Sequence, residues 1–175
     1  METRFLFMCS FALAGSTLVL AQDYHQEASL PVMGRITDGE NKLEGCEVIT
    51  YRGNERMASV LTDKSGKFRA ELALNGEFSL EFHKKGFVPK RILVDTSFPL
   101  QMDDLMFDPL MMDISLLATD KYQGVATDEL DFPFARVRFD TKTQTFAQDQ
   151  EWTMDMQRTN GALLLAAGRV EKRSK

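Results

Sequence analysis

Hydrophobic and polar residues alternate along most of the segment from residue 32 to residue 95. Phe68 and Leu72 occupy alternate positions of one run, and the positions on the other face are charged. Phe78, Leu80 and Phe82 repeat the pattern one run later, between polar neighbours. Because successive side chains of a strand point to opposite faces, each run predicts a strand with one apolar and one polar face.

Turn residues separate these runs at short intervals. Asp63 and Gly66 bound a segment typical of a tight turn, and Asn75 followed by Gly76 is a strong hairpin signal. Short strands at this spacing, without a helical pattern between them, predict a mainly β protein with an antiparallel β-sandwich. The expected strands are residues 32–37, 46–51, 57–62, 67–72, 77–83 and 87–95.

Two residues in this part carry more specific expectations. Pro89 cannot donate a ladder hydrogen bond, so it marks the last of these strands as an edge strand or a bulge. Cys46 alternates with Val48 and has Glu44 and Glu47 as neighbours. This setting favours a small apolar core position for Cys46 over a reactive thiol.

The pattern is weaker after residue 96. Residues 98–109 are typical of a connecting arm and residues 120–131 of polar turns, whereas residues 111–117 and 133–139 alternate as strands do. Trp152, Met156, Leu163 and Ala167 then recur at helical spacing, with Asp149 as the expected N-cap and Asn160-Gly161 as an expected interruption. This predicts a C-terminal strand and helix appendage that packs on the sandwich or presents a surface to a partner.

The first residues are typical of a secretory signal peptide. Arg4 supplies a positive charge, residues 5–20 are almost uncharged, and small residues precede a cleavage position between Ala21 and Gln22. A retained N-terminal anchor is the alternative interpretation. The expected organisation is a signal peptide over residues 1–21, a flexible N-terminus over 22–31, the sandwich over 32–96 and the extension over 97–175. The expected location is the periplasm or the cell exterior, without a membrane span after cleavage.

Composition and charge narrow the classes of function. The 175 residues are 43% hydrophobic, which is enough for one domain with a core and a smaller appendage. A net charge of −5 with short, interrupted basic clusters argues against nucleic acid as a partner. Cys9 lies in the expected signal peptide, so Cys46 has no partner for an intramolecular disulfide in the mature chain.

The order and spacing of the turns resemble the carboxypeptidase regulatory-like domain. This resemblance implies a transthyretin-like (prealbumin-like) β-sandwich over about residues 32–95, as found in small exported proteins of Bacteroidetes-type bacteria. It transfers no peptidase activity, because the chain has no peptidase zinc motif. It also leaves a homodimer through edge strands open, with Pro89 opposing such pairing on its own edge. The motifs are Gly34-x-Ile36-x-Asp38, Leu43-Glu44-Gly45-x-x-Val48, Thr62-Asp63-x-x-Gly66-x-Phe68, Phe78-x-Leu80 and Lys85-Gly86-Phe87-x-x-Lys90.

Candidate chemistry is sparse. The segment from Tyr51 to Asn54 resembles the signature of 5-hydroxyisourate hydrolases, which share the transthyretin-like fold, but it lies between early strands and not at the end of the chain. His25 and His83 are the two histidines, too few with Cys46 for a zinc cluster. We therefore expect no catalytic, cofactor-binding or metal-binding residues. The acidic group of Asp103, Asp104, Asp108 and Asp113 does not match a calcium loop, and the methionines at 102, 106, 111 and 112 fit core filling better than an adaptable surface.

These observations predict a non-enzymatic, exported interaction or structural module of the bacterial envelope. Its expected partner is an envelope protein or a glycan whose identity the sequence does not name. The alternative is a small hydrolase or a carbohydrate-processing accessory protein. A cleft with two or more titratable groups would favour the alternative, whereas an apolar patch or an open sheet edge would favour the module.

Overall fold

The computed structural model describes residues 28–99, 107–122 and 133–173. The expected signal peptide, its cleavage position between Ala21 and Gln22, and His25 lie outside these residues. The elements in chain order are β1 (Ser29–Thr37), β2 (Glu47–Arg52), β3 (Glu55–Leu61), β4 (Lys67–Ala73), β5 (Glu77–His83), β6 (Lys90–Asp95), β7 (Leu110–Ser115), the 3-10 helix η1 (Thr119–Tyr122), β8 (Ala135–Asp140), β9 (Thr145–Gln148) and α1 (Gln150–Arg173).

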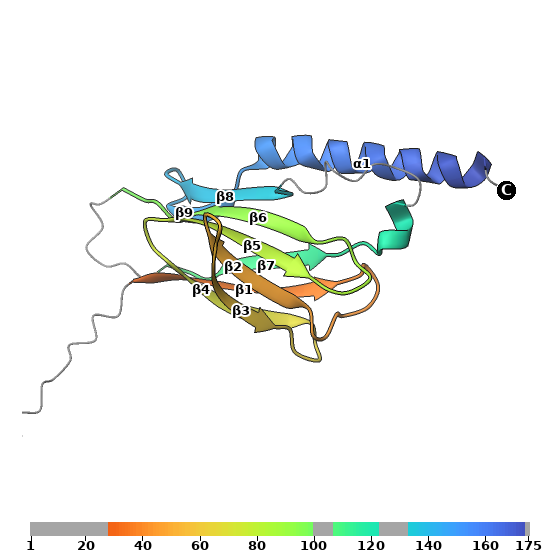
Figure 1. Ribbon diagram of the computed structural model, residues 1–175. Coiled ribbons are helices and arrows are strands. Elements are labelled where there is room, and N and C mark those ends of the chain that lie inside the picture. The colour runs from red at the N-terminus through yellow and green to blue at the C-terminus, as the bar shows by residue number, and fades with distance from the viewer. Residues whose placement is uncertain (1–27, 100–106, 123–132, 174–175) are drawn as a thin grey trace, which may run out of the picture.

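The strands form two stacked sheets (Figure 1). The smaller sheet has the order β4-β1-β7, and the larger has the order β3-β2-β5-β6-β8-β9. Their inner faces share one hydrophobic core, to which both the first part of the chain and its tail contribute. The fold is thus mainly β, a sandwich with a C-terminal helix, as the alternation predicts. Among the described residues, no helix combines the length and apolar character that a membrane crossing requires.

The strands before residue 96 follow the sequence pattern closely. Phe68 and Leu72 of β4 and Phe78, Leu80 and Phe82 of β5 are all buried, as the alternation predicts. Burial of each such side chain stabilises the fold by about 1.5–3 kcal/mol. All strand pairs within this part are antiparallel. The turn that begins at Asp63 is closed by hydrogen bonds from the amides of Ser65 and Lys67 to the Asp63 carboxylate, both at 2.8 Å.

The strands of the tail enter both sheets. β7 lies parallel to β1 with Leu110 opposite Val32, and β8 lies parallel to β6 with Ala135 opposite Ile92. These two parallel pairings join the tail to the antiparallel strands of the first part, and the sequence pattern predicted no partner for either tail strand. β9 was not expected at all, because its four residues show a single apolar alternation. It forms a hairpin with β8 and becomes the edge of the larger sheet.

Pro89 does not mark an edge strand. It lies just before β6, whose first residue is Lys90, so its missing N–H removes no ladder hydrogen bond. β6 is an inner strand of the sheet, between β5 and β8. The edge that Pro89 was expected to protect is covered by the tail.

Gly34 allows the close approach of β1 and β7. A Cβ atom at this position would lie 2.1 Å from the carbonyl oxygen of Met112, which is backbone and cannot swing aside. The residue also heads the first motif of the family resemblance. Glycine is required at this position by the close approach of β7, a strand that lies outside those motifs.

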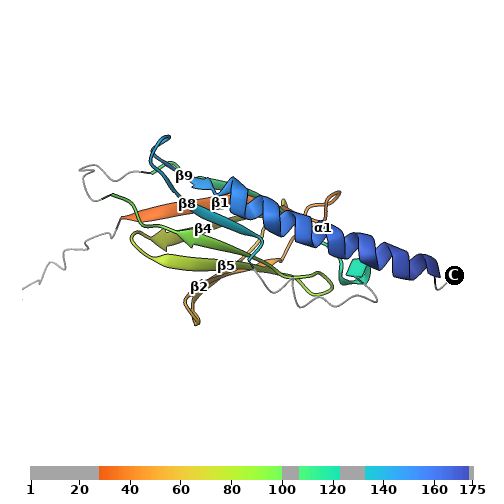
Figure 2. The same ribbon diagram turned by 90° about the horizontal axis from the view of Figure 1, so that it is seen from above.

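The helix α1 begins where the sequence predicts and continues further. The Asp149 carboxylate accepts a hydrogen bond from the Trp152 amide at 3.3 Å, which is the expected N-cap. The expected interruption at Asn160-Gly161 is wrong, because the helix runs through both residues. The Asn160 side chain instead accepts a hydrogen bond from the Tyr122 hydroxyl at 2.6 Å and fixes α1 to η1. Seen from above, α1 crosses the sandwich and extends past it (Figure 2).

Candidate interaction site

Cys46 lies in the core, as the sequence predicts. It is fully buried, and its thiol donates a hydrogen bond to the carbonyl oxygen of His83 at 3.4 Å. Burial raises the pKa of Cys46 to about 11, and the Lys84 charge opposes this rise only in part. The thiol is therefore protonated at neutral pH and is not a nucleophile in the folded protein.

The other candidate residues are not gathered into a site. His83 is exposed at the end of β5, and Tyr51 is half-buried on β2, where it pairs with Ser79 in the sheet register. Among the residues that the structure describes, no three metal-ligating side chains cluster. Met102, Met106, Asp103 and Asp104 lie outside those residues.

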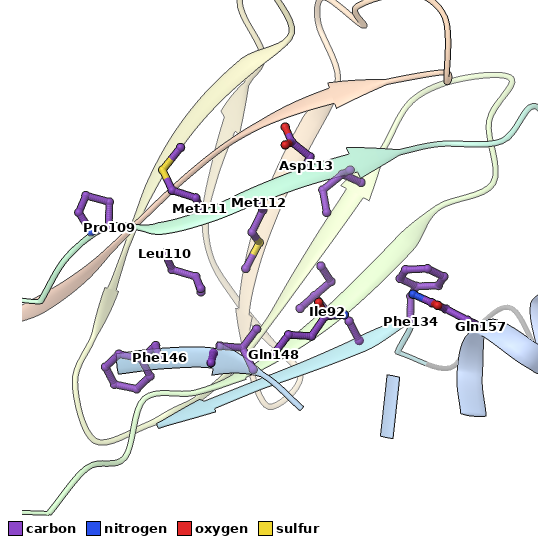
Figure 3. Close-up of a pocket in the computed structure, with 14 residues that line it drawn as sticks. Ile92, Pro109, Leu110, Met111, Met112, Asp113, Phe134, Phe146, Gln148 and Gln157 are labelled. Atoms are coloured by element: carbon purple, nitrogen blue, oxygen red, sulfur yellow. The ribbon is translucent and has the colours of Figure 1, made fainter. Parts of the chain in front are cut away.

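A cleft of about 450 Å³ opens between the two sheets where the smaller sheet ends at β7. The β8–β9 hairpin forms its opposite wall, and α1 adds one side chain to its rim (Figure 3). Among the described lining residues, Ile92 alone precedes residue 96, and the tail supplies the rest. The lining residues are Ile92, Pro109, Leu110, Met111, Met112, Asp113, Ile114, Phe134, Ala135, Val137, Phe146, Ala147, Gln148 and Gln157.

The cleft has apolar walls and a polar rim. Met112 is buried and Met111 is 69% exposed, although the two are neighbours on β7, because alternate side chains of a strand point in opposite directions. Of the two described methionines of this stretch, Met112 therefore belongs to the core and Met111 to the surface. Gln148 and Gln157 add exposed amides. Among the described lining residues, Asp113 carries the one titratable side chain.

Aromatic packing closes the sandwich beside the cleft. Phe107 contacts Phe98, Phe139 and Phe146 edge to face, with ring centroids 5.4, 6.2 and 5.0 Å apart. Such pairs are worth about 0.5–1.5 kcal/mol beyond their buried area. Because Phe146 also lines the cleft, this cluster holds the β8–β9 wall in place.

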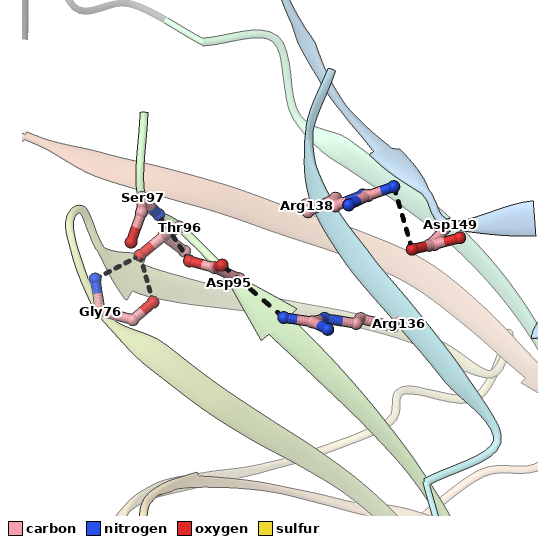
Figure 4. A network of polar contacts seen from close by, with 7 residues as sticks. All are labelled: Gly76, Asp95, Thr96, Ser97, Arg136, Arg138 and Asp149. Carbon is pink, nitrogen blue, oxygen red and sulfur yellow. Dashed lines mark hydrogen bonds and ion pairs between the residues drawn. The ribbon is translucent and has the colours of Figure 1, made fainter. Parts of the chain in front are cut away.

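A polar network fixes the tail to the end of β6 (Figure 4). The buried Thr96 hydroxyl accepts a hydrogen bond from the Gly76 amide at 3.0 Å and donates one to the Ala73 carbonyl at 2.8 Å. Beside it, Asp95 lies 4.0 Å from the Arg136 guanidinium of β8. The neighbouring Arg138 pairs with the N-cap residue of α1, Asp149, at 3.2 Å. Arg136 thus links β8 to the end of β6, and Arg138 links β8 to the start of α1.

The opposite edge of the larger sheet is formed by β3. Its residues are exposed except for Val60, which is half-buried. Met57 and Leu61 are 52% and 68% exposed. β2 is its one strand partner among the described residues. The sequence analysis did not predict this exposed edge, nor did it identify Phe146, Gln148 or Gln157 as site residues. The one signal available for β3 is the lack of charged residues from Met57 to Leu61.

Three solved structures each match about half of this chain. No family model and no curated protein matches the chain. The Bacillus anthracis TIE protein matches 52% of this chain and 17% of its own length at a TM-score of 0.41 and 13% identity. A DUF3823 family protein from Parabacteroides merdae matches 51% of this chain and 46% of its own at a TM-score of 0.37 and 16% identity. 3-Chlorocatechol 1,2-dioxygenase from Rhodococcus opacus matches 56% of this chain and 62% of its own length at a TM-score of 0.41 and 12% identity. The chain thus spans less than two thirds of each of these proteins.

Proposed function

We propose that the protein is a non-enzymatic, exported interaction module that uses the cleft between its sheets to hold apolar groups of a partner. The exported location is supported by the pattern of residues 1–21. A carboxypeptidase regulatory-like origin of the sandwich is supported by the spacing of its turns. The observation that carries the function is the composition of the cleft, which has apolar walls and a single carboxylate among its described lining residues.

A catalytic role for the cleft lacks support in the side chains that line it. General acid–base catalysis uses groups within hydrogen-bond reach of the reacting atoms and with suitable pKa values. Asp113 is exposed, and His83 and Cys46 belong to elements that do not line the cleft. Apolar walls with a few polar groups at the rim are instead typical of recognition sites.

The tail is the part of the chain that this proposal assigns to recognition. β7, β8, β9 and α1 all contribute side chains to the cleft. A fragment that ends at Asp95 would lack these elements and would leave β1 and β6 with unpaired edges. Point variants of the whole mature chain therefore test the proposal better than a truncation.

The test is a pull-down from envelope extract with immobilised mature chain, residues 22–175. Gln148→Glu introduces a charge at the rim, and Gln150→Glu places the same change at the start of α1, at an exposed residue that does not line the cleft. We expect a partner that the wild type and Gln150→Glu retain and Gln148→Glu loses. Equal retention by all three would contradict a role for the cleft.

A second measurement addresses catalysis directly. The purified wild type and an Asp113→Asn variant are incubated with p-nitrophenyl esters and glycosides. We expect no turnover above the uncatalysed rate for either protein. Turnover by the wild type that Asp113→Asn abolishes would contradict the non-enzymatic proposal.

A further inference from the structure

The cleft is bordered by the outer edges of two strands. Its lining includes every residue from Pro109 to Ile114, although alternate side chains of β7 point to opposite faces of the smaller sheet. Consecutive residues can all line one cleft only where the edge of the strand, and not one of its faces, borders it. Phe146 to Gln148 on β9 are consecutive in the same way. Among the described residues, β7 has β1 and β9 has β8 as its one strand neighbour.

The polar backbone groups on the outer edge of β7 can be assigned. The carbonyl of Met112 faces β1, because its oxygen would clash with a Cβ atom at Gly34. The N–H and C=O groups of successive strand residues point to opposite edges, so those of Met111 and Asp113 point away from β1. No turn or loop among the described residues forms a backbone hydrogen bond with these groups. This edge therefore offers donors and acceptors at the spacing of a strand.

The larger sheet extends beyond this edge. The smaller sheet ends at β7, whereas the larger continues from β6 to β8 and β9. Figure 3 shows Leu110 and Met112 pointing from β7 toward the β8–β9 hairpin. On the hairpin side of the cleft, Val137 and Phe146 present buried apolar side chains. A strand added beside β7 would lie across this apolar wall, and every second side chain of that strand would enter the cleft.

We propose that the cleft binds an extended segment of a partner polypeptide, which pairs with β7 as a fourth strand of the smaller sheet and inserts alternate apolar side chains between the sheets. This inference rests on the proposed function and names the chemistry of the partner. β7 is the longer of the two edges, with six residues against four in β9. The lining from Pro109 to Ile114 corresponds to about 17 Å of strand, so the segment pairs over about six residues.

Other occupants satisfy fewer of these features. An acyl chain would fill the apolar volume, but it would cover the backbone groups of Met111 and Asp113 without offering them partners. A second copy could pair its own β7 with this edge, but its Leu110 and Met112 would stay in its own core and leave the cleft unfilled. The charge of Asp113 has Arg35 opposite it in the register, so the segment needs no charge of its own.

The probes for the test are three capped synthetic octapeptides. The first alternates leucine with threonine, the second has serine in place of each leucine, and the third is the leucine peptide with N-methyl groups on its central amides. Binding to the mature chain, residues 22–175, is followed by NMR shifts and amide hydrogen exchange. We expect the leucine peptide to slow exchange at the amides of Met111 and Asp113. The other two should bind at least about tenfold more weakly, because one lacks the apolar row and the other lacks backbone donors.

Two variants at one position separate the backbone from the side chain. Met111→Pro removes an amide that points away from β1, whereas Met111→Ala keeps this amide and removes an exposed side chain. We expect Met111→Pro to weaken binding of the leucine peptide about tenfold or more and Met111→Ala to change it less than about threefold. The NMR spectrum of each variant shows whether β7 still pairs with β1. If Met111→Pro does not fold, the N-methylated peptide on the wild type carries the same test.

Three results would overturn the proposal. The first is equal binding of the leucine peptide and its N-methylated form, which would show that apolar groups enter the cleft without strand pairing. The second is no protection of the Met111 and Asp113 amides at up to about 1 mM peptide, where even a weak complex is populated, or protection at β9 instead. The third is protection before any peptide is added, which would assign the edge to a second copy or to another part of this chain.

These outcomes are distinct from those that test the proposed function. A partner that is retained from extract and lost with Gln148→Glu supports the cleft even where the peptides show no strand pairing. Equal retention by Gln148→Glu and Gln150→Glu contradicts the proposed function, whatever the peptides show.

Discussion

The two sides of the larger sheet differ in which elements lie next to its strands. At one side, β6 is covered by β8, β9 and the start of α1, with a polar network from Asp95 to Asp149 across the join. At the other side, β3 ends the sheet; its first residues, Glu55 and Arg56, are charged, and the five that follow are uncharged and mostly exposed. The tail thus covers one edge and builds a cleft there, whereas at the other edge β2 is the one strand neighbour of β3 among the described residues.

The largest expected effect breaks the attachment of the tail. Gly34→Ala places a Cβ against the Met112 carbonyl, so β1 and β7 must separate. We expect the free energy of unfolding to fall by about 3 kcal/mol, measured by urea denaturation. Gly161→Ala is the control, because a Cβ there meets nothing within 4 Å, and helix propensity should raise stability by about 0.5–1 kcal/mol. A loss below about 1 kcal/mol for Gly34→Ala would mean that β7 is not held closely against β1.

A matched pair of core variants tests whether the covered edge is part of the same core. Val94 on β6 and Val137 on β8 are opposite each other in the register and are 1% and 4% exposed. We expect Val94→Ala and Val137→Ala to cost about 2 kcal/mol each, with a measurable coupling in the double variant. A negligible cost for Val137→Ala alone would show that the tail is only loosely attached.

The pH dependence of stability reports on the buried thiol on the β3 side of the larger sheet. Folding raises the pKa of Cys46 from 9.0 to about 11, so the folded state binds this proton more tightly than the unfolded state does. The stabilisation is fully present below about pH 9 and is lost as the pH rises toward 11, by about 1 kcal/mol per pH unit. Urea denaturation at several pH values should show this slope as the difference between wild type and Cys46→Ala. Identical slopes would contradict the raised pKa.

The smallest effect concerns the start of α1 on the covered side. Thr153 is 2% exposed, and its hydroxyl has no hydrogen-bond partner among the described residues. Thr153→Val keeps the shape and removes the unpaired hydroxyl, so we expect a gain of up to about 1 kcal/mol in urea denaturation. Thr159→Val is the control, because the Thr159 hydroxyl donates to the Asp155 carbonyl at 3.3 Å. A loss of stability in Thr153→Val would indicate a buried water on that hydroxyl.

Local signals account for what the sequence could predict. The alternation of Phe78, Leu80 and Phe82 and the turn chemistry of Asp63 depend on neighbours in the chain, and the structure confirms both. The core position of Cys46 and the N-cap at Asp149 belong to the same class. Each of these expectations requires information from only a few residues.

The features that the sequence did not predict depend on contacts between residues that are far apart in the chain. The alternation of residues 111–117 predicts a strand, but it does not show which strand will be its neighbour or in which direction the two will pair. The parallel pairing of β7 with β1 could therefore not be predicted. In the sequence, Asn160 resembles a helix break. In the fold, its side chain accepts a hydrogen bond from the Tyr122 hydroxyl, a residue 38 positions away. The cleft could not be predicted for the same reason, since its walls come from β7, β8, β9 and α1, and its existence follows from the parallel pairings.

The parallel pairing of β1 with β7 also has a consequence for how the chain folds. Val32 lies opposite Leu110, so β1 finds its second neighbour 78 residues further along the chain (110 minus 32). Long-range pairings of this kind raise the contact order and slow folding, because the closure of a long loop precedes the contacts that stabilise it. During synthesis, β1 is made before β7, so it lacks its second strand neighbour until the tail has been made. The smaller sheet is therefore completed late, and the cleft is formed with it.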